Sequence, residues 1–129
     1  MYKRQGIYRL ADVALAPTRF AGESYPLCLI QAMQTGAAVI ASDVGEIAAM
    51  IRQNGRDAGL LVEAVRDTAQ FEDNVLQAME RMLDNKLRNR LREGAAAIGE
   101  TYAIEEVARR YAALYAQMVA EAAAHAKAA

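Results

Sequence analysis

Two polar side chains, Glu23 and Gln31, stand eight residues apart around the start of an expected helix. A carboxylate accepts hydrogen bonds from hydroxyl groups, and a carboxamide both accepts and donates them. Eight residues of helix make about two turns, so the two side chains can face the same groove. This pair of residue types indicates a site for a ligand rich in hydroxyl groups, as a sugar is.

The loop from Pro17 to Tyr25, which feeds the expected helix, favours a second kind of ligand, an anion. We expect it to lead from a turn-rich connection into the helix, with Ser24 as the cap and Pro26 in the first turn. Unpaired N–H groups and the helix dipole attract negative charge at the N-terminus of a helix, and a diphosphate is the ligand we expect there. The residues expected to line the site are Gly22, Glu23, Ser24, Tyr25, Pro26, Leu27 and Gln31.

Apolar runs and helical stretches alternate in the part of the chain that carries these residues. The expected strands cover residues 11–16, 37–41 and 59–62, and the expected helices cover residues 27–36 and 47–53. Such alternation predicts right-handed crossovers, a parallel sheet, and a ligand site at the carboxyl ends of the strands. Because a doubly wound sheet has roughly five or six strands, we expect the front of this domain to precede the chain. The predicted fold is α/β with a partial Rossmann-like parallel sheet.

Only helices are expected after Val62, within residues 67–119, and they complete the same domain. Three apolar stripes at helical spacing predict them. The stripes are Phe71, Val75, Met79 and Met82, then Leu87, Leu91, Ala95 and Ile98, then Ile104, Val107, Tyr111, Leu114 and Met118. We expect a helix break at residues 99–101 and a frayed Ala-rich tail over residues 120–129.

A few side chains outside the site also carry expectations. Tyr102, Tyr111 and Tyr115 should pack the last helix against the body, and Cys28 should be a small core residue. His125, the only histidine, lies in the tail and has no expected role.

Composition narrows the class of protein. The net charge of −1 and the pI near 5.8 argue against a nucleic-acid partner, which needs a concentrated basic face. One cysteine fits a reducing compartment, so we expect a cytoplasmic protein. Residues 1–5, Met-Tyr-Lys-Arg-Gln, match the translation of a transposase end used in sequencing-library preparation, so we expect them to be a scar outside the fold.

Three stretches, in order along the chain, resemble one enzyme family. They read Ala-Asp-Val-Ala-Leu-Ala-Pro-Thr, Gly-Glu-Ser-Tyr-Pro-Leu-Cys-Leu-Ile-Gln-Ala-Met and Thr-Gly-Ala-Ala-Val-Ile-Ala-Ser-Asp-Val-Gly-Glu-Ile. Together with Ala-Gly-Leu-Leu-Val and the closing Ala-Arg-Arg-Tyr-Ala-Ala-Leu-Tyr, they resemble the donor-binding half of retaining glycosyltransferases of the GT-B fold, known as family 4 or glycosyl transferases group 1. The resemblance covers roughly residues 8–118. It implies that residues 6–66 form part of a nucleotide-sugar-binding unit.

The resemblance also implies roles for the site residues. Glu23 matches the first Glu of the family's Glu-x7-Glu motif, which holds hydroxyls of the donor sugar near the reaction centre, so it is the candidate catalytic residue. The backbone of residues 24–27 is expected to donate N–H groups to the sugar and the diphosphate. Gln31 replaces the second Glu, which grips the ribose, and implies a softer grip on the nucleotide. Glu46 stands where the family usually has a glycine and adds negative charge.

The implied function is sugar transfer from a nucleotide-diphosphate donor in polysaccharide or glycoconjugate biosynthesis. The nucleotide-sugar is a substrate, and neither a cofactor nor a metal site is expected. A saccharide or lipid-linked acceptor would bind an N-terminal domain that is missing here, so we expect this chain alone to be inactive. Whether that domain contacts the inner face of the membrane stays open. Two alternatives remain: a non-catalytic nucleotide-sugar-binding or scaffold module, and part of a nucleotide-sugar 2-epimerase.

Overall fold

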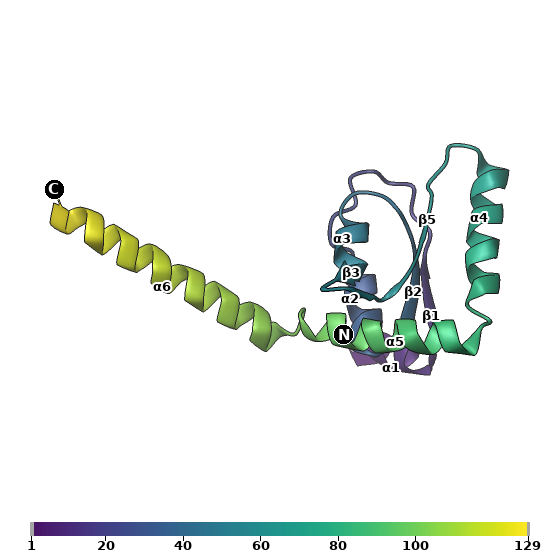
Figure 1. Ribbon diagram of the computed structural model, residues 1–129, viewed down its shortest axis with the longest axis horizontal. Coiled ribbons are helices and arrows are strands. Elements are labelled where there is room, and N and C mark those ends of the chain that lie inside the picture. The colour runs from purple at the N-terminus through teal and green to yellow at the C-terminus, as the bar shows by residue number, and fades with distance from the viewer. Residues whose placement is uncertain (1, 129) are drawn as a thin grey trace.

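The computed structural model describes residues 2–128, with the side chains of residues 6–125. The body is an α/β unit, and a long helix leads away from it (Figure 1). The elements in chain order are α1 Tyr2–Leu10, β1 Val13–Ala16, α2 Leu27–Gln34, β2 Ala38–Ser42, α3 Ile47–Ile51, β3 Arg52–Gln53, β4 Arg56–Asp57, β5 Gly59–Val62, α4 Thr68–Arg81, α5 Asn85–Glu100 and α6 Ile104–Ala128.

The main sheet has the order β1-β2-β5, and both strand pairs are parallel. Val13 pairs with Ala38 at one end of the sheet, and Ser42 pairs with Val62 at the other. The predicted parallel sheet is therefore confirmed, and its three strands lie within two residues of their expected bounds. Because all three strands run the same way, their carboxyl ends meet at one edge.

Side chains of β2 alternate between two buried faces of the sheet. Val39 and Ala41 belong to the apolar cluster that includes residues of α2 and α3. Ala38 and Ile40 belong to the cluster that includes Phe71 of α4. Figure 1 shows α4 on one side of the sheet and the pair α2 and α3 on the other. Every residue of β2 is buried, as expected for a central parallel strand.

A short hairpin, β3–β4, replaces the end of the helix expected over residues 47–53. The helix ends at Ile51, and Arg52 pairs antiparallel with Asp57. Asn54 and Gly55, at φ 52° and 74°, form the two-residue turn between the strands. Asn-Gly is the sequence that a tight type I′ hairpin turn prefers, so the turn signal was correct although the strands were missed.

Helix α5 crosses the end of the sheet opposite the β1–α2 loop (Figure 1). Leu91, Ala95 and Ile98 are buried, which confirms the second apolar stripe. The helix break expected at residues 99–101 lies at residues 101–103, because α5 continues to Glu100 and α6 begins at Ile104. A Cβ at Gly99 would meet the backbone of Met33 and Gln34, so the glycine serves close packing on α2.

Helix α6 extends away from the body, contrary to the expectation that its apolar stripe packs down (Figure 1). All residues from 108 to 125 are exposed, including Tyr111 at 57% and Leu114 at 49%. Of the three tyrosines expected to pack the last helix down, Tyr102, just before the helix, contacts the body. The tail that was expected to fray continues as helix as far as Ala128. No helix among the residues described combines the length and apolarity that crossing a bilayer requires.

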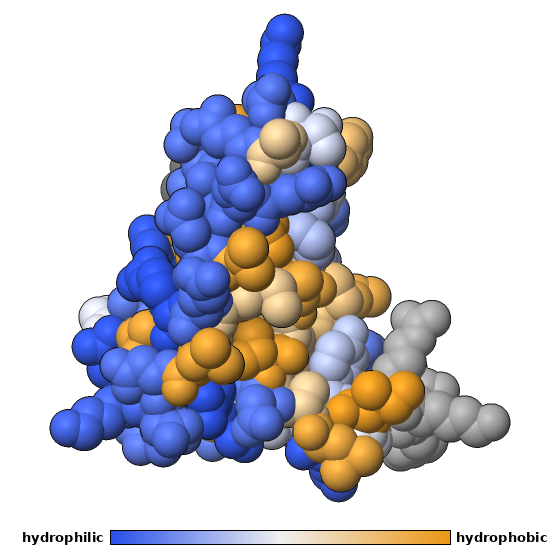
Figure 2. Space-filling model, turned by 90° about the vertical axis from the view of Figure 1, so that its right-hand side faces the viewer, coloured by the Kyte–Doolittle hydropathy of each residue, from blue (hydrophilic) through white to orange (hydrophobic). Residues whose placement is uncertain are grey.

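The strand β1 has a partner on one side only, which leaves it at the edge of the sheet. Beside it lies a hollow of about 310 Å³ that is lined by Leu15, Met79 and Leu83 among others. Figure 2 shows apolar side chains gathered on this side of the molecule, which carries α4. Leu76 and Met79 of α4, and Leu83 two residues beyond its end, are among the exposed apolar side chains.

Candidate functional site

The loop from β1 to α2, residues 17–26, leaves the carboxyl end of the sheet and carries most of the expected site. Its shape is set by short-range bonds. The amide of Phe20 donates to Thr18 Oγ1 at 3.1 Å, and the amide of Glu23 donates to the carbonyl of Phe20 at 3.1 Å. Gly22, Ser24 and Tyr25 are exposed along this loop.

Glu23 is held through its backbone. Its carbonyl oxygen accepts a hydrogen bond of 3.2 Å from the amide of Glu46, which precedes α3. The same oxygen lies where a Cβ on Gly45 would stand. Glu23 is half-buried, and its carboxylate makes no hydrogen bond or ion pair with the side chains that the structure describes. Its oxygens are therefore free to accept bonds from a ligand.

Helix α2 begins without a side-chain cap. Pro26 occupies the N-cap position, so the expected capping role of Ser24 is wrong. Proline has no side-chain acceptor, and the first N–H groups of any helix lack an intrahelical partner. The amides of Leu27 and Cys28 are consequently left for solvent or for an anion. Cys28 is exposed, which corrects its assignment to the core.

Gln31 lies one turn into α2 and is half-buried. The buried side of this helix is made by Leu29, Ala32 and Met33, so Gln31 shares the opposite flank with exposed Leu27, four residues before it. No hydrogen bond joins Gln31 to Glu23 among the described residues. The structure thus places Gln31 beside the start of α2 without bringing it into contact with the carboxylate.

Tyr25 turns back toward the junction of α5 and α6. Its ring lies edge-to-face against that of Tyr102, with centroids 6.2 Å apart and planes at 63°. The Tyr102 hydroxyl accepts a bond of 2.7 Å from Gln53 Nε2 and lies 3.3 Å from the carbonyl of Met50. Burial raises the pKa of Tyr102, and the nearby Tyr25 adds to the rise. Tyr25 therefore anchors the loop with its ring, and its expected ligand contact is limited to the backbone.

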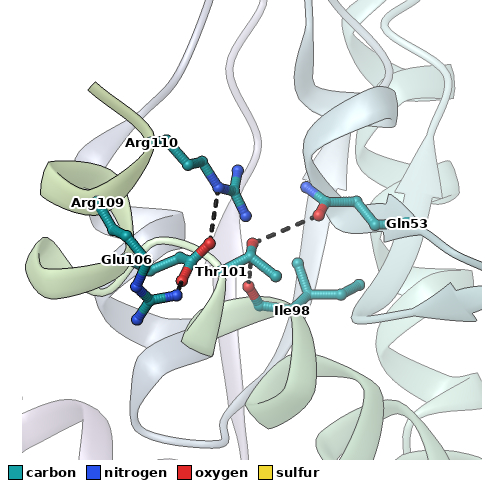
Figure 3. Close-up of polar contacts among 6 residues, drawn as sticks. All are labelled: Gln53, Ile98, Thr101, Glu106, Arg109 and Arg110. Atoms are coloured by element: carbon teal, nitrogen blue, oxygen red, sulfur yellow. Dashed lines mark hydrogen bonds and ion pairs between the residues drawn. The ribbon is translucent and has the colours of Figure 1, made fainter. Parts of the chain in front are cut away.

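The same junction holds polar contacts that the sequence did not reveal. Figure 3 shows Thr101 between Gln53 and Ile98, and its hydroxyl lies 3.4 Å from Gln53 Oε1 and 2.7 Å from the Ile98 carbonyl. Glu106 pairs with both Arg109 and Arg110, and the hydrogen bond from Arg110 Nε is 2.9 Å long. That bond lowers the pKa of Glu106.

Arg19, which sequence reasoning left without a role, lies on the α4 side of the loop. Its guanidinium carbon is 4.5 Å from the centre of the Phe71 ring, and its Nη1 donates to Thr68 Oγ1 at 3.2 Å. A separation of 49 residues between Arg19 and Thr68 explains why no local pattern predicts the contact.

The residues described contain no group of three or more acidic, cysteine or histidine side chains that could hold a metal ion. A further hollow of about 470 Å³ lies between the β3–β4 turn and α5, lined by Arg56, Arg90 and Glu93 among others. This hollow lies away from the β1–α2 loop.

The chain is similar to known proteins in both sequence and fold. Residues 3–81 match the family described as glycosyl transferases group 1. The lipopolysaccharide core biosynthesis mannosyltransferase LpsB of Rhizobium meliloti (strain 1021) is 30% identical over 114 residues, which are 87% of this chain and 30% of that protein. A sucrose-phosphate synthase from Thermosynechococcus elongatus superposes with a TM-score of 0.71 and 26% identity, over 89% of this chain and 27% of that one.

The chain thus spans about a third or less of the proteins it matches. The family match begins at residue 3, inside the five residues that we expected to be a scar, and that expectation stays a prediction. The α/β fold is similar to that of a GT-B glycosyltransferase, as the sequence predicted. With more than half of its length matched, this chain belongs to the glycosyl transferases group 1 family.

Proposed function

We propose that the chain is the donor-binding part of a retaining glycosyltransferase, which moves a sugar from a nucleoside diphosphate donor to a saccharide or lipid-linked acceptor. The observation that carries the proposal is the pairing of the free carboxylate of half-buried Glu23 with the uncapped start of α2, at the carboxyl edge of a parallel sheet. Such edges are where open α/β sheets bind ligands.

The two parts of the site suit the two parts of a nucleotide-sugar. The free amides of Leu27 and Cys28 offer hydrogen bonds and the positive end of the helix dipole to the diphosphate. The carboxylate of Glu23 would repel phosphate, so its partner is the sugar, whose hydroxyls donate to it. Gln31 would meet a ribose hydroxyl with its amide, a weaker bond than a carboxylate makes.

In a retaining transfer, the bond from the anomeric carbon to the diphosphate oxygen breaks, and the acceptor hydroxyl enters on the same face. The diphosphate takes the bonding electrons, and the acceptor proton leaves with it or with a base. Residues of this chain would hold the sugar in place and stabilise the leaving group through backbone N–H groups. We assign the cations that neutralise the diphosphate, and the acceptor site, to protein upstream of this chain.

The name of the mannosyltransferase relative supports a saccharide acceptor in glycoconjugate biosynthesis. A donor made in the cytoplasm would place the parent enzyme there, and contact with the inner face of the membrane would come from the upstream domain. Nucleotide-sugar is consumed as a substrate, so no cofactor is part of the proposal.

The decisive experiment replaces Glu23 by Ala in a complete parent enzyme. We expect kcat/KM to fall at least thirtyfold, about 2 kcal/mol, on the scale of one lost preorganised contact. Glu80→Ala, an exposed residue near the end of α4 that points away from the β1–α2 loop, is the control and should leave the rate unchanged. An unaltered rate in Glu23→Ala would remove this residue from the site.

Gln31 and Glu46 give one reason to keep a second candidate, a nucleotide-sugar-binding or scaffold module without turnover. Both depart from the family pattern in ways that weaken a grip on a nucleoside diphosphate. A parent that binds nucleotide-sugar and never transfers or hydrolyses the sugar would be such a module. Reaction products separated by chromatography distinguish the two.

A further inference from the structure

Arg19 ties the start of the β1–α2 loop to a helix on the far side of the sheet. Its two partners, Thr68 and Phe71, lie in the first turn of α4. Glu23, four residues later in the same loop, is fixed instead to Glu46 at the start of α3. Because α3 and α4 flank opposite faces of the sheet, the loop spans the carboxyl edge and is held on both sides (Figure 1).

The α4 end of this arrangement is rigid. Asp67 caps the helix by accepting a bond of 2.8 Å from the amide of Gln70. Phe71 is 7% exposed and belongs to the buried cluster with Ile40, Val62 and Leu91. Arg19 therefore stacks on a ring that cannot readily move, although Arg19 itself is exposed.

The contact uses features that only arginine combines. A planar guanidinium stacks on an aromatic face, and the attraction of a cation to that face persists at an exposed site. The hydrogen bond to Thr68 adds to this contact. A lysine at this position would keep the charge and lose the plane and the fork of donors.

We propose that Arg19 is a positioning residue. Its hydrogen bond to Thr68 and its stacking on Phe71, together called the Arg19 clasp, fix the loop that presents Glu23 to the donor sugar. The ordering of the loop stands on contacts within this chain alone. Its consequence for a ligand rests on the proposed function of the Glu23 site.

Amide hydrogen exchange of the whole 129-residue chain, followed by NMR, tests the clasp without a ligand. The reporters are the amide of Glu46, which donates to Glu23, and the amide of Glu23 itself. In Arg19→Ala we expect both to exchange about threefold to tenfold faster, which corresponds to losing about 0.7–1.4 kcal/mol of local ordering. Thr68→Val removes the hydrogen bond alone and should give a smaller increase.

Two controls separate positioning from general destabilisation. The amides of Ile40 and Ala41 in central β2 should keep their wild-type exchange in every variant. Arg81→Ala removes an exposed arginine from the other end of α4 and should change neither reporter. Wild-type exchange of the Glu46 amide in Arg19→Ala would overturn the clasp.

Titration with UDP-glucose, read at the amides of Leu27 and Cys28, tests the consequence for binding. Where the wild-type chain responds, we expect Arg19→Ala and Arg19→Lys both to weaken Kd by about threefold or more. A direct contact with phosphate would instead be largely preserved by Lys, and full binding by Arg19→Lys would overturn positioning. No response in the wild-type chain would count against the proposed function, while the exchange result still decides the clasp.

Discussion

The carbonyl oxygen of Glu23 occupies the space beside Gly45 that the Cβ of any other residue would fill. Gly45 also has φ 52°, in the left-handed region where a side chain is disfavoured. Two separate features thus require glycine at this position, the backbone angle and the approach of the loop. The close approach is what lets the Glu46 amide reach the Glu23 carbonyl at 3.2 Å.

Gly45→Ala should therefore lower the free energy of unfolding by about 2–3 kcal/mol, measured by urea denaturation. The unfavourable φ accounts for about 1–2 kcal/mol, and displacement of the Glu23 backbone accounts for the rest. Gly55→Ala is the matched control, because its φ is 74° and nothing lies within 4 Å of its added Cβ. The control should lose only the backbone part, about 1–2 kcal/mol. Equal losses in the two variants would show that the contact with Glu23 has no energetic weight.

Ser42 carries a second prediction, at the carboxyl end of β2. Its side chain is fully buried, and within the described part of the chain its Oγ finds no hydrogen-bond partner. An unsatisfied buried hydroxyl destabilises the folded state, so Ser42→Ala should leave stability unchanged or raise it by about 1 kcal/mol. The reverse change on the same strand face, Ala38→Ser, should lower stability by about 1–3 kcal/mol. A clear loss in Ser42→Ala would reveal a bound water or other partner for this hydroxyl.

Much of the sheet followed from the sequence because its signals are local. Buried strands read as short apolar runs, and the stripe from Leu87 to Ile98 marks the buried face of α5. The hairpin after α3 was missed because two-residue strands are too short to show a period, although Asn54 and Gly55 carried the turn signal. Helix α1, Tyr2–Leu10, was not predicted because residues 1–5 were set outside the fold.

The candidate site was only partly predictable, for a different reason. Glu23 and the start of α2 lie close together in the chain, so a motif could identify them. The contacts that shape the loop join distant segments, as Arg19 does with Thr68 and Tyr25 does with Tyr102. A local pattern does not encode which distant side chain will arrive. Ser24 was assigned as a cap because its residue type suits one, yet the helix begins after Pro26.

Acid should loosen the start of α6 through Glu106. The hydrogen bond from Arg110 holds the pKa of this carboxyl below its ordinary value of 4.5, with Arg109 adding a smaller effect. Because the pKa of Glu106 is lowered in the folded chain, its ion pairs stabilise the helix at pH values above the ordinary pKa. This stabilisation is lost as the pH falls through the lowered pKa. NMR titration of the Glu106 side chain should show Arg110→Ala raising the pKa more than Arg109→Ala does. The opposite order would contradict the assigned contacts.

Two leucines, Leu91 and Leu114, belong to stripes that look alike in sequence and differ in surroundings. Leu91 is 2% exposed beneath the sheet, whereas Leu114 is 49% exposed on α6. Leu91→Ala should cost about 2–5 kcal/mol of unfolding free energy, because it leaves a cavity in a packed core. Leu114→Ala should change it by no more than about 0.5 kcal/mol, because alanine keeps the helix and no core contact is lost.

Urea denaturation of the whole chain measures both, with the slope of the transition checking that each variant unfolds from the same state. A loss of more than about 1 kcal/mol in Leu114→Ala would mean that α6 folds back onto the body in solution. The apolar stripe of α6 would then be buried against the body, as we expected from the sequence. Agreement with the structure would instead show that a helical stripe predicts a helix without predicting what covers it, because periodicity reports the helix and burial depends on the partner.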